Sequence, residues 1–413
     1  MFVLRDYQEE AVQLGVSFLL DKSKKNANKK GIIVCPTGGG KSLVIANIAQ
    51  RIDGRVIIFQ PTKELLEQNF AKYISYGNYA EIYSASKGRK KISQVTFATI
   101  GSVVNKPQLF SDFQYCIIDE CDLVSPSDST MYQKFLSKLD MRVIGLTATP
   151  IRMKRYNFPN AHSKLCMLDR MNPRYFNHYI HITQIQEMVS RGFFMAPKYI
   201  SFSFDESLLS VNTTGGDYTE QSIDASFVHN DILGNIERVV RGIIQKGIIM
   251  HVLIFVESIG HAEQMQQILG DSICGVVSSR TKKKEREDIL KAFKSGKLLC
   301  VVNCGVLVCG FDFPELDCII LGRPTFSLRL HYQIIGRGVR PHKTKERLYV
   351  IDFVNNVKRL GMIEQLQFVR DGRSWAIHNG KRILTNVDIT QNGEEDGKGR
   401  EEPEWGIRGR SWR

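Results

Sequence analysis

The chain of 413 residues is long enough for two or three domains, and its 43% hydrophobic and 24% charged residues are an ordinary globular balance. That balance excludes a disordered, collagen-like or disulfide-stapled chain. Lys and Arg number 56 against 43 Asp and Glu, for a net charge of +13, which favours a polyanionic partner, nucleic acid before an anionic membrane surface.

Apolar segments alternate with helical segments over residues 1–160. The apolar residues between Arg5 and Leu20 recur at helical spacing and predict a helix with one apolar face. Strands are then predicted at Gly31–Cys35, Val56–Gln60, Gln94–Ala98, Tyr115–Ile118 and Arg142–Leu146. Strands rich in Ile and Val that are separated by helices are typical of a parallel sheet covered on both faces. Residues 1–160 are therefore predicted to form one α/β domain.

A second α/β region is predicted at residues 226–360, after an aromatic-rich connector at 161–225. It opens with a helix at Asp231–Gln245. Its strands are predicted at His251–Val256, Ile273–Val277, Leu298–Asn303, Leu316–Leu321 and Leu348–Phe353. Repeated strand–helix units again indicate a parallel sheet. Residues 361–413 lose this periodicity and are expected to form a C-terminal extension that is partly disordered.

A glycine-rich loop lies between the first predicted strand and the helix Leu43–Arg51. Its glycines let successive backbone N–H groups face a phosphate, and the helix amino terminus adds positive potential. Lys41 would reach the β- and γ-phosphates, and the Ser42 hydroxyl would hold Mg²⁺. The general pattern has Gly six residues before the Lys, where this chain has Cys35. The predicted nucleotide-binding residues are Thr37, Gly38, Gly39, Gly40, Lys41 and Ser42.

Two acidic residues end the predicted strand Tyr115–Ile118. Asp119 would lie at the carboxyl edge of the sheet, beside the glycine-rich loop, where its carboxylate would bind Mg²⁺. Glu120 would orient and deprotonate the attacking water. Two acids after a strand are common by chance, but their position about 80 residues after a phosphate-binding loop makes this role specific.

A basic segment, Gln333–Arg340, contains two arginines three positions apart, which places Arg337 and Arg340 on one face of a helix or turn. An arginine at the γ-phosphate stabilises the transition state of phosphoryl transfer and accelerates it by about 10³–10⁵-fold. The alternative is a basic helix end that faces solvent.

These three segments, in this order, resemble the motifs of superfamily 2 helicases, and the resemblance covers Leu4 to about Gly361. It implies an α/β fold of two tandem RecA-like domains, with parallel sheets flanked by helices, a short connector and a C-terminal tail. The two domains would bind ATP and Mg²⁺ between them and hold a nucleic-acid strand across both. ATP binding would bring the domains together, and hydrolysis would release them.

The resemblance also implies roles for residues outside the glycine-rich loop. Leu4–Gln8 resembles the adenine-recognition segment, so Gln8 would pair with the base edge and Arg5 would lie near it. Val308–Pro314 resembles the segment that contacts the strand and the ribose, the latter through Asp312. The residues expected at the γ-phosphate are Gln333, Arg337 and Arg340.

Two further segments resemble those that bind the strand, where hydroxyls and backbone N–H groups meet phosphates without reading the base sequence. Thr147–Pro150 resembles the segment that couples the nucleotide site to this surface. Ordinary capping and turn formation would use the same Thr and Ser residues. The implied DNA-binding residues are Pro61, Thr62, Lys63, Thr99, Gly101 and Ser102, and the coupling residues are Asp122, Thr147 and Thr149.

The Thr147–Thr149 and Gln333–Ile334 variants of these motifs are most similar to DNA translocases of the restriction-subunit type and to phage UvsW-like recombination helicases. We therefore expect a monomeric ATP-dependent DNA helicase or translocase that unwinds or branch-migrates forked DNA in replication, recombination or repair. Because the adenine segment begins at Leu4, we expect a minimal motor without an amino-terminal duplex-binding domain. The alternatives are a duplex translocase that does not separate strands, an RNA helicase, and a non-catalytic nucleic-acid clamp.

Cysteine usage and the absence of targeting patterns indicate the compartment. Nine cysteines are scattered along the chain, and Cys300, Cys304 and Cys309 lie in Val- and Leu-rich sequence, where buried thiols are favoured over metal ligands. No apolar run reaches the roughly 18 residues that cross a bilayer, and Met1–Asp6 has no secretory pattern. We expect cytoplasmic localisation, in the host cytoplasm if the chain is viral.

Overall fold

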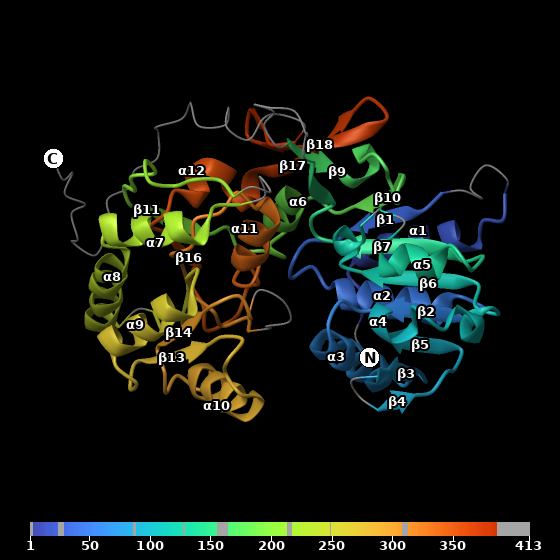
Figure 1. Cartoon of the computed structure of the whole chain (residues 1–413), viewed down its shortest axis with the longest axis horizontal. Coiled ribbons are helices and arrows are strands. Elements are labelled where there is room, and N and C mark those ends of the chain that lie inside the picture. The colour runs from blue at the N-terminus through green and yellow to red at the C-terminus, as the bar shows by residue number, and fades with distance from the viewer. Residues whose placement is uncertain are drawn as a thin grey trace. The chain divides into compact units, whose positions relative to one another are not determined.

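The computed structural model describes residues 3–23, 29–85, 88–125, 127, 129–154, 164–212, 217–247, 249–307 and 313–385. The chain divides into two compact units, whose elements are labelled in Figure 1. The first unit comprises Met1–Lys154, Leu165–Gln184 and Phe368–Ala376, and the second comprises Arg155–Lys164, Ile185–Gln367 and Ile377–Arg413. Within the described ranges, no helix is both long and apolar enough to span a bilayer.

The first unit is built on an eight-stranded sheet. Its order is β10 (His178–Ile182), β1 (Gly31–Val34), β7 (Arg142–Thr147), β6 (Tyr115–Asp119), β2 (Val56–Phe59), β5 (Val95–Ala98), β3 (Glu81–Ser84) and β4 (Arg89–Lys90). Neighbouring strands run parallel except β3 and β4, which are antiparallel. The strands β1, β2, β5 and β6 are buried throughout, because helices cover the sheet.

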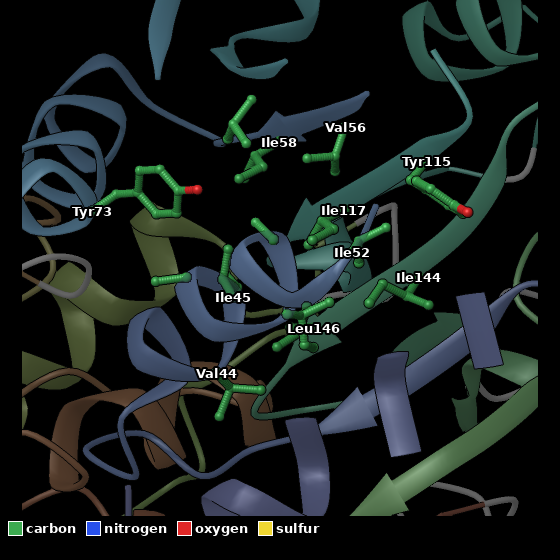
Figure 2. Packing of buried hydrophobic residues seen from close by; sticks show 14 of the residues in the cluster. Val44, Ile45, Ile52, Val56, Ile58, Tyr73, Tyr115, Ile117, Ile144 and Leu146 are labelled. Atoms are coloured by element: carbon green, nitrogen blue, oxygen red, sulfur yellow. The ribbon is translucent and has the colours of Figure 1, made fainter. Parts of the chain in front are cut away.

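Helices of the first unit pack their apolar faces on this sheet. They are α1 (Asp6–Leu20), α2 (Lys41–Arg51), α3 (Lys63–Ser75), α4 (Ile100–Val103) and α5 (Met131–Leu136). Figure 2 shows Ile45 of α2 in one apolar core with Ile58, Ile117 and Leu146 of the sheet. A short two-stranded sheet, β8 (Ile151–Lys154) with β9 (Lys164–Met167), lies outside the main sheet.

The second unit contains a six-stranded parallel sheet. Its order is β11 (Lys198–Ser201), β16 (Tyr349–Asp352), β15 (Cys318–Leu321), β12 (Val252–Phe255), β14 (Cys300–Asn303) and β13 (Cys274–Val277). The helices of this unit are α6 (Ile185–Ser190), α7 (Glu220–His229), α8 (Ile232–Lys246), α9 (Ile259–Leu269), α10 (Lys283–Lys294), α11 (Leu328–Ile335) and α12 (Asn356–Leu360). The predicted fold class, two parallel α/β units, is confirmed.

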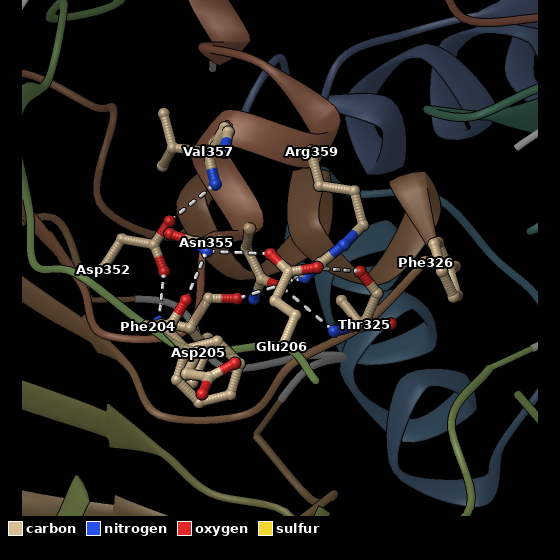
Figure 3. Close-up of polar contacts among 12 residues, drawn as sticks. Phe204, Asp205, Glu206, Thr325, Phe326, Asp352, Asn355, Val357 and Arg359 are labelled. Atoms are coloured by element: carbon tan, nitrogen blue, oxygen red, sulfur yellow. Dashed lines mark hydrogen bonds and ion pairs between the residues drawn. The ribbon is translucent and has the colours of Figure 1, made fainter. Parts of the chain in front are cut away.

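A buried arginine holds the loops at one end of the second sheet together (Figure 3). The guanidinium of Arg359, 9% exposed, donates to the Thr325 carbonyl at 3.1 Å and to Asn356 Oδ1 at 2.9 Å, and it pairs with Glu206 at 3.2 Å. Asp352 at the end of β16 accepts backbone N–H groups of Val354 and Val357. These bonds fix the start of α12 against the loop that leads into α11.

The predicted strands of both halves occur within one or two residues of their expected bounds, but the segment 161–225 differs from a simple connector. Its residues 165–184 belong to the first unit, where β10 is an edge strand, and residues 185–225 belong to the second, where β11 is an edge strand. Both are short and mostly half-buried. Edge strands tolerate polar and charged residues, so they lack the apolar runs that predicted the central strands.

The expected C-terminal extension contains a further small sheet. Its strands are β17 (Leu366–Asp371), β18 (Ser374–Asn379) and β19 (Arg382–Ile383), in that order. Within the first unit, Gln184 exchanges two hydrogen bonds with the backbone of Phe368 (2.8 and 3.0 Å), and Ser374 donates to Asp169 at 2.7 Å. Residues 386–413, where disorder is expected, lie outside the described residues.

Candidate nucleotide-binding site

The glycine-rich loop joins β1 to α2 at the carboxyl edge of the first sheet, as predicted. Gly38 and Gly40 have φ values of 85° and 87°, which L side chains rarely adopt. A Cβ on Gly40 would also lie 2.3 Å from Nε2 of Gln8. Burial raises the pKa of the Cys35 thiol to about 12, so the residue that replaces the usual glycine remains a neutral, packed side chain.

Two side chains from the start of α1 hold this loop. The Tyr7 hydroxyl donates to the Gly39 carbonyl at 2.8 Å, and Gln8 Nε2 donates to the same oxygen at 2.9 Å. Gln8 Oε1 accepts from the Arg5 backbone N–H at 2.9 Å. Gln8 thus lies beside the loop and Arg5 is exposed next to it, while the adenine role of Gln8 stays a prediction. Tyr7 is not among the residues predicted from sequence, because a tyrosine on a helix carries no distinctive signal.

Lys41, the first residue of α2, is held by the two acids at the end of β6. Its Nζ lies 3.1 Å from Asp119 Oδ1 and forms a short ion pair with Glu120. Burial opposes the ammonium charge, but the two carboxylates outweigh this effect and raise the pKa of Lys41. The lysine therefore stays charged beside the loop.

Glu120 adopts a left-handed backbone conformation, with φ of 50°. This conformation is uncommon for a residue with a long side chain, and such strain concentrates at functional sites. Here it turns the chain directly after β6, so that Asp119 and Glu120 both reach Lys41. The backbone N–H of Glu120 also donates to Asp119 Oδ1 at 3.0 Å.

A buried asparagine connects the acidic pair to the segment after β2. Asn69 Nδ2 on α3 donates to Asp119 Oδ2 at 3.3 Å and to Gln60 Oε1 at 2.8 Å. Asn69 is not among the residues predicted from sequence, since one amide in an amphipathic helix carries no distinctive signal. Its contacts link the predicted metal-binding acid to the predicted strand-binding segment that begins after Gln60.

The residues predicted to couple the two sites lie together. Thr147 Oγ1 donates to Asp122 Oδ1 at 2.7 Å, and the Thr149 backbone N–H donates to Thr147 Oγ1 at 3.0 Å. The side chains of all three are almost fully buried. Because the Thr147 carbonyl also accepts from Cys35 N at 2.9 Å, this cluster is connected directly to the start of the glycine-rich loop.

The predicted strand-binding residues follow β2 and β5, neighbouring parallel strands whose carboxyl ends share the same edge. Thr62 caps α3, with its hydroxyl accepting from the Leu65 N–H at 3.2 Å, and Lys63 is exposed beside it. Thr99 and Ser102 hydroxyls lie 2.9 Å apart near the exposed Gly101. Pro61 is half-buried at the start of the same loop.

The first unit offers few protein ligands for a metal. Among the described residues, no group of three or more His, Cys, Asp or Glu side chains could hold an ion. Mg²⁺ in phosphate-binding sites is typically held by one or two protein groups together with water and substrate phosphates. The buried Asp119 carboxylate and the half-buried Ser42 beside the loop fit that sparse ligand set.

The residues predicted to meet the γ-phosphate belong to the second unit. Gln333 is 3% exposed on α11, and Arg337 and Arg340 are half-buried in the turn that follows the helix. Burial lowers the pKa of Arg340 from its usual value. Asp312, predicted at the ribose, and Cys309 lie outside the described residues. The described cysteines are buried, apart from the half-buried Cys304.

Two family models match the chain, one in each unit. The model of the res subunit of type III restriction enzymes matches residues 1–152. The model of the helicase conserved C-terminal domain matches residues 235–342. The two matches together span much of both α/β units.

Relatives from yeast, an archaeon and a phage show partial similarity. The Saccharomyces cerevisiae protein IRC3, which its name proposes to be an ATP-dependent helicase, is 25% identical over 85% of this chain and 51% of its own length. The DNA 3′-5′ translocase XPB2 of Sulfurisphaera tokodaii is 26% identical over 84% of this chain and 80% of its own. A 51.5 kDa protein of a Lactococcus phage is 27% identical over 79% and 66%. The chain thus spans about half the length of IRC3.

Solved structures share the fold at low identity. The ATP-dependent Type ISP restriction-modification enzyme LlaBIII bound to DNA has a TM-score of 0.59 and 17% identity, covering 86% of this chain and 28% of that one. Saccharomyces cerevisiae Dbp5 bound to RNA and ADP BeF3 has a TM-score of 0.52 and 15% identity, covering 84% and 83%. These similarities confirm that the two α/β units are RecA-like.

Proposed function

We propose that the protein is an ATP-dependent motor that moves along DNA. The observation that carries this proposal is Lys41, held charged between Asp119 and Glu120 beside a loop whose glycines have the backbone geometry of a phosphate cradle. The matches of both units to helicase-type models support it, as does the similarity to a protein named as a DNA translocase.

In this proposal, the γ-phosphate takes the place of the acids as the partner of Lys41. Ser42 and Asp119 would hold Mg²⁺, which would supply positive charge at the phosphates. Glu120, released from Lys41, orients the attacking water and accepts its proton. Arg337 and Arg340 stabilise the charge that develops on the transferred phosphoryl group, with Gln333 beside it.

The contacts of Asp122, Thr147 and Thr149 support a path from the phosphate loop to the DNA-binding residues. Thr147 bonds both to Asp122 and, through its carbonyl, to the residue that begins the loop. A shift of the loop on hydrolysis would thereby reach the carboxyl edge of the sheet. There the segments Pro61–Lys63 and Thr99–Ser102 would hold strand phosphates.

The decisive test is DNA-stimulated ATP hydrolysis. We expect DNA to raise the turnover of the wild type and Lys41→Ala to reduce it about 10²–10³-fold, because a preorganised charge at the phosphates is lost. Lys283→Ala, an exposed lysine in the second unit, is the matched control and should retain full turnover. Residual activity that Lys41→Ala does not change would contradict the proposal.

The finer part of the proposal is action on forked or branched DNA, by unwinding or branch migration. A matched panel of forks with either overhang, four-way junctions, blunt duplexes and RNA duplexes tests it. Translocation without strand separation on any of them would favour a duplex translocase, and preferential stimulation by RNA would favour an RNA helicase. Binding without hydrolysis would favour a clamp.

We also propose that the protein acts as a monomer in a reducing compartment such as the cytoplasm. The burial of most described cysteines, as expected of small packed thiols, supports the reducing compartment. Measurement of the native mass with and without DNA tests whether the protein is monomeric.

A further inference from the structure

A buried lysine lies directly behind the arginine segment of the second unit. Lys345 is 5% exposed at the end of a tight turn, in which its backbone N–H donates to the His342 carbonyl at 3.0 Å. The turn directs the side chain back under the segment. There Lys345 Nζ donates to the Gly338 carbonyl at 2.5 Å and to the Leu316 carbonyl at 3.1 Å.

The Gly338 carbonyl belongs to the peptide bond that links Gly338 to Val339, between the two arginines. The neighbouring Val339 carbonyl accepts from the Met195 backbone N–H at 2.7 Å. Gly338 also packs against Leu348 so closely that an added Cβ would lie 2.5 Å from that side chain. The backbone between Arg337 and Arg340 is therefore fixed by a lysine, a backbone N–H and an apolar side chain.

Lys345 also reaches the segment that precedes β15. The Leu316 carbonyl, its second acceptor, lies two residues after Pro314, the end of the segment predicted to contact the strand and ribose. One ammonium group thus joins the arginine segment to the residues that lead into β15. Packing of these residues does not require a charge, because an apolar side chain of similar volume would fill the buried position at a lower desolvation cost.

Burial is unfavourable for this ammonium group. Burial lowers the pKa of Lys345 to about 8; the Asp317 carboxylate opposes this shift, and the positive charge of Arg340 adds to it. A lysine placed under these conditions stabilises through its two directed hydrogen bonds, which are stronger when the donor is charged. What those bonds fix is the path of the backbone between the arginines.

We propose that Lys345 is a positioning residue, which holds Arg337 and Arg340 in the orientation in which they stabilise the transferred γ-phosphoryl group. The proposal rests on the proposed function and extends it to a residue that does not itself touch ATP.

The test is Lys345→Met, which keeps the volume and removes the donors. We expect turnover at saturating ATP to fall about 10–100-fold, since small displacements of positioned groups cost this much. Affinity for a fluorescent ATP analogue should stay within about twofold, because in this proposal the phosphate loop of the first unit carries most of the binding energy. Lys343→Met, an exposed lysine of the same turn, is the matched control and should behave as the wild type.

Two further variants separate positioning from a general structural role. Lys345→Gln retains N–H donors on a shorter side chain and should give intermediate turnover, which also keeps the test open if Lys345→Met does not fold. In an Arg340→Ala background, the factor lost to Lys345→Met should shrink, because one of the arginines that Lys345 positions is gone. If the loss of turnover in the double variant equals the product of the two single-variant losses, the proposal is overturned.

The outcomes distinguish this proposal from the proposed function. If the wild type does not hydrolyse ATP, or if Arg340→Ala hydrolyses it normally, the proposed function fails. If the wild type is active, Arg340→Ala is impaired and Lys345→Met turns over normally, only the positioning role fails. Equal loss of ATP affinity and turnover in Lys345→Met would also overturn it.

Discussion

Lys41 in the first unit and Lys345 in the second are both largely buried lysines near residues expected to bind ATP, yet their pKa values shift in opposite directions. Two carboxylates surround Lys41, so its pKa is raised. Lys345 bonds to backbone carbonyls, and burial lowers its pKa to about 8. The difference separates a charge kept ready for an incoming anion from a charge used to hold the backbone.

The largest expected effect on ATP hydrolysis comes from substituting an acid beside Lys41. Glu120→Gln keeps the size of the side chain but removes the base, and hydrolysis should fall about 10²–10⁴-fold. ATP should still bind, because Lys41 keeps its charge and Asp119 remains beside it. The measurement compares turnover with the affinity for a fluorescent ATP analogue, with the exposed Glu10→Gln as control. A parallel loss of binding and turnover would show that Glu120 is needed for the loop itself.

A smaller effect on ATP binding is expected at the Gly39 carbonyl of the phosphate loop. This carbonyl accepts side-chain hydrogen bonds, as the Gly338 carbonyl does in the second unit. Tyr7→Phe removes the hydroxyl that donates to the Gly39 carbonyl and leaves Gln8 as its side-chain donor. One hydrogen bond of about 0.5–1.5 kcal/mol corresponds to a rise in the KM for ATP of about 2–10-fold. Steady-state kinetics check this, with the exposed Tyr79→Phe as control. An unchanged KM would mean that Gln8 alone fixes the loop.

The smallest effect is on stability, and its sign follows from the lowered pKa of Lys345. Between pH 8 and 10.5, the unfolded chain binds a proton at this position that the folded chain has lost, so folding becomes more favourable as pH rises. The free energy of unfolding of the wild type should gain about 1–3 kcal/mol over Lys345→Met across this window. Below pH 8 the difference should stay constant.

Denaturation at pH 7.5 and 9.5 measures this difference directly. Lys343→Met should show no such dependence relative to the wild type, because Lys343 is exposed. A difference between wild type and Lys345→Met that does not change with pH would contradict the burial of a titrating ammonium group at this position.

The central strands and the phosphate loop could be predicted from sequence because their signals are local. A run such as Val56–Phe59 is buried on both faces and is therefore apolar throughout, and the loop needs glycines at fixed spacing. Asn69, Tyr7 and Lys345 could not be identified, because each acts through a partner that is distant in sequence or lies behind a turn. Edge strands β10 and β11 were missed because half-exposed strands need no apolar run.

The small C-terminal sheet has a consequence for any shortened form of the protein. Its residues Phe368–Ala376 belong to the unit that holds the phosphate loop, although the rest of the sheet belongs to the other unit. Cutting the chain after Gly361 would look like trimming an appendage, but it would leave Gln184 and Asp169 without their partners Phe368 and Ser374. The two units are interleaved in sequence, so a cut after Gly361 removes a part of the first unit as well as of the second.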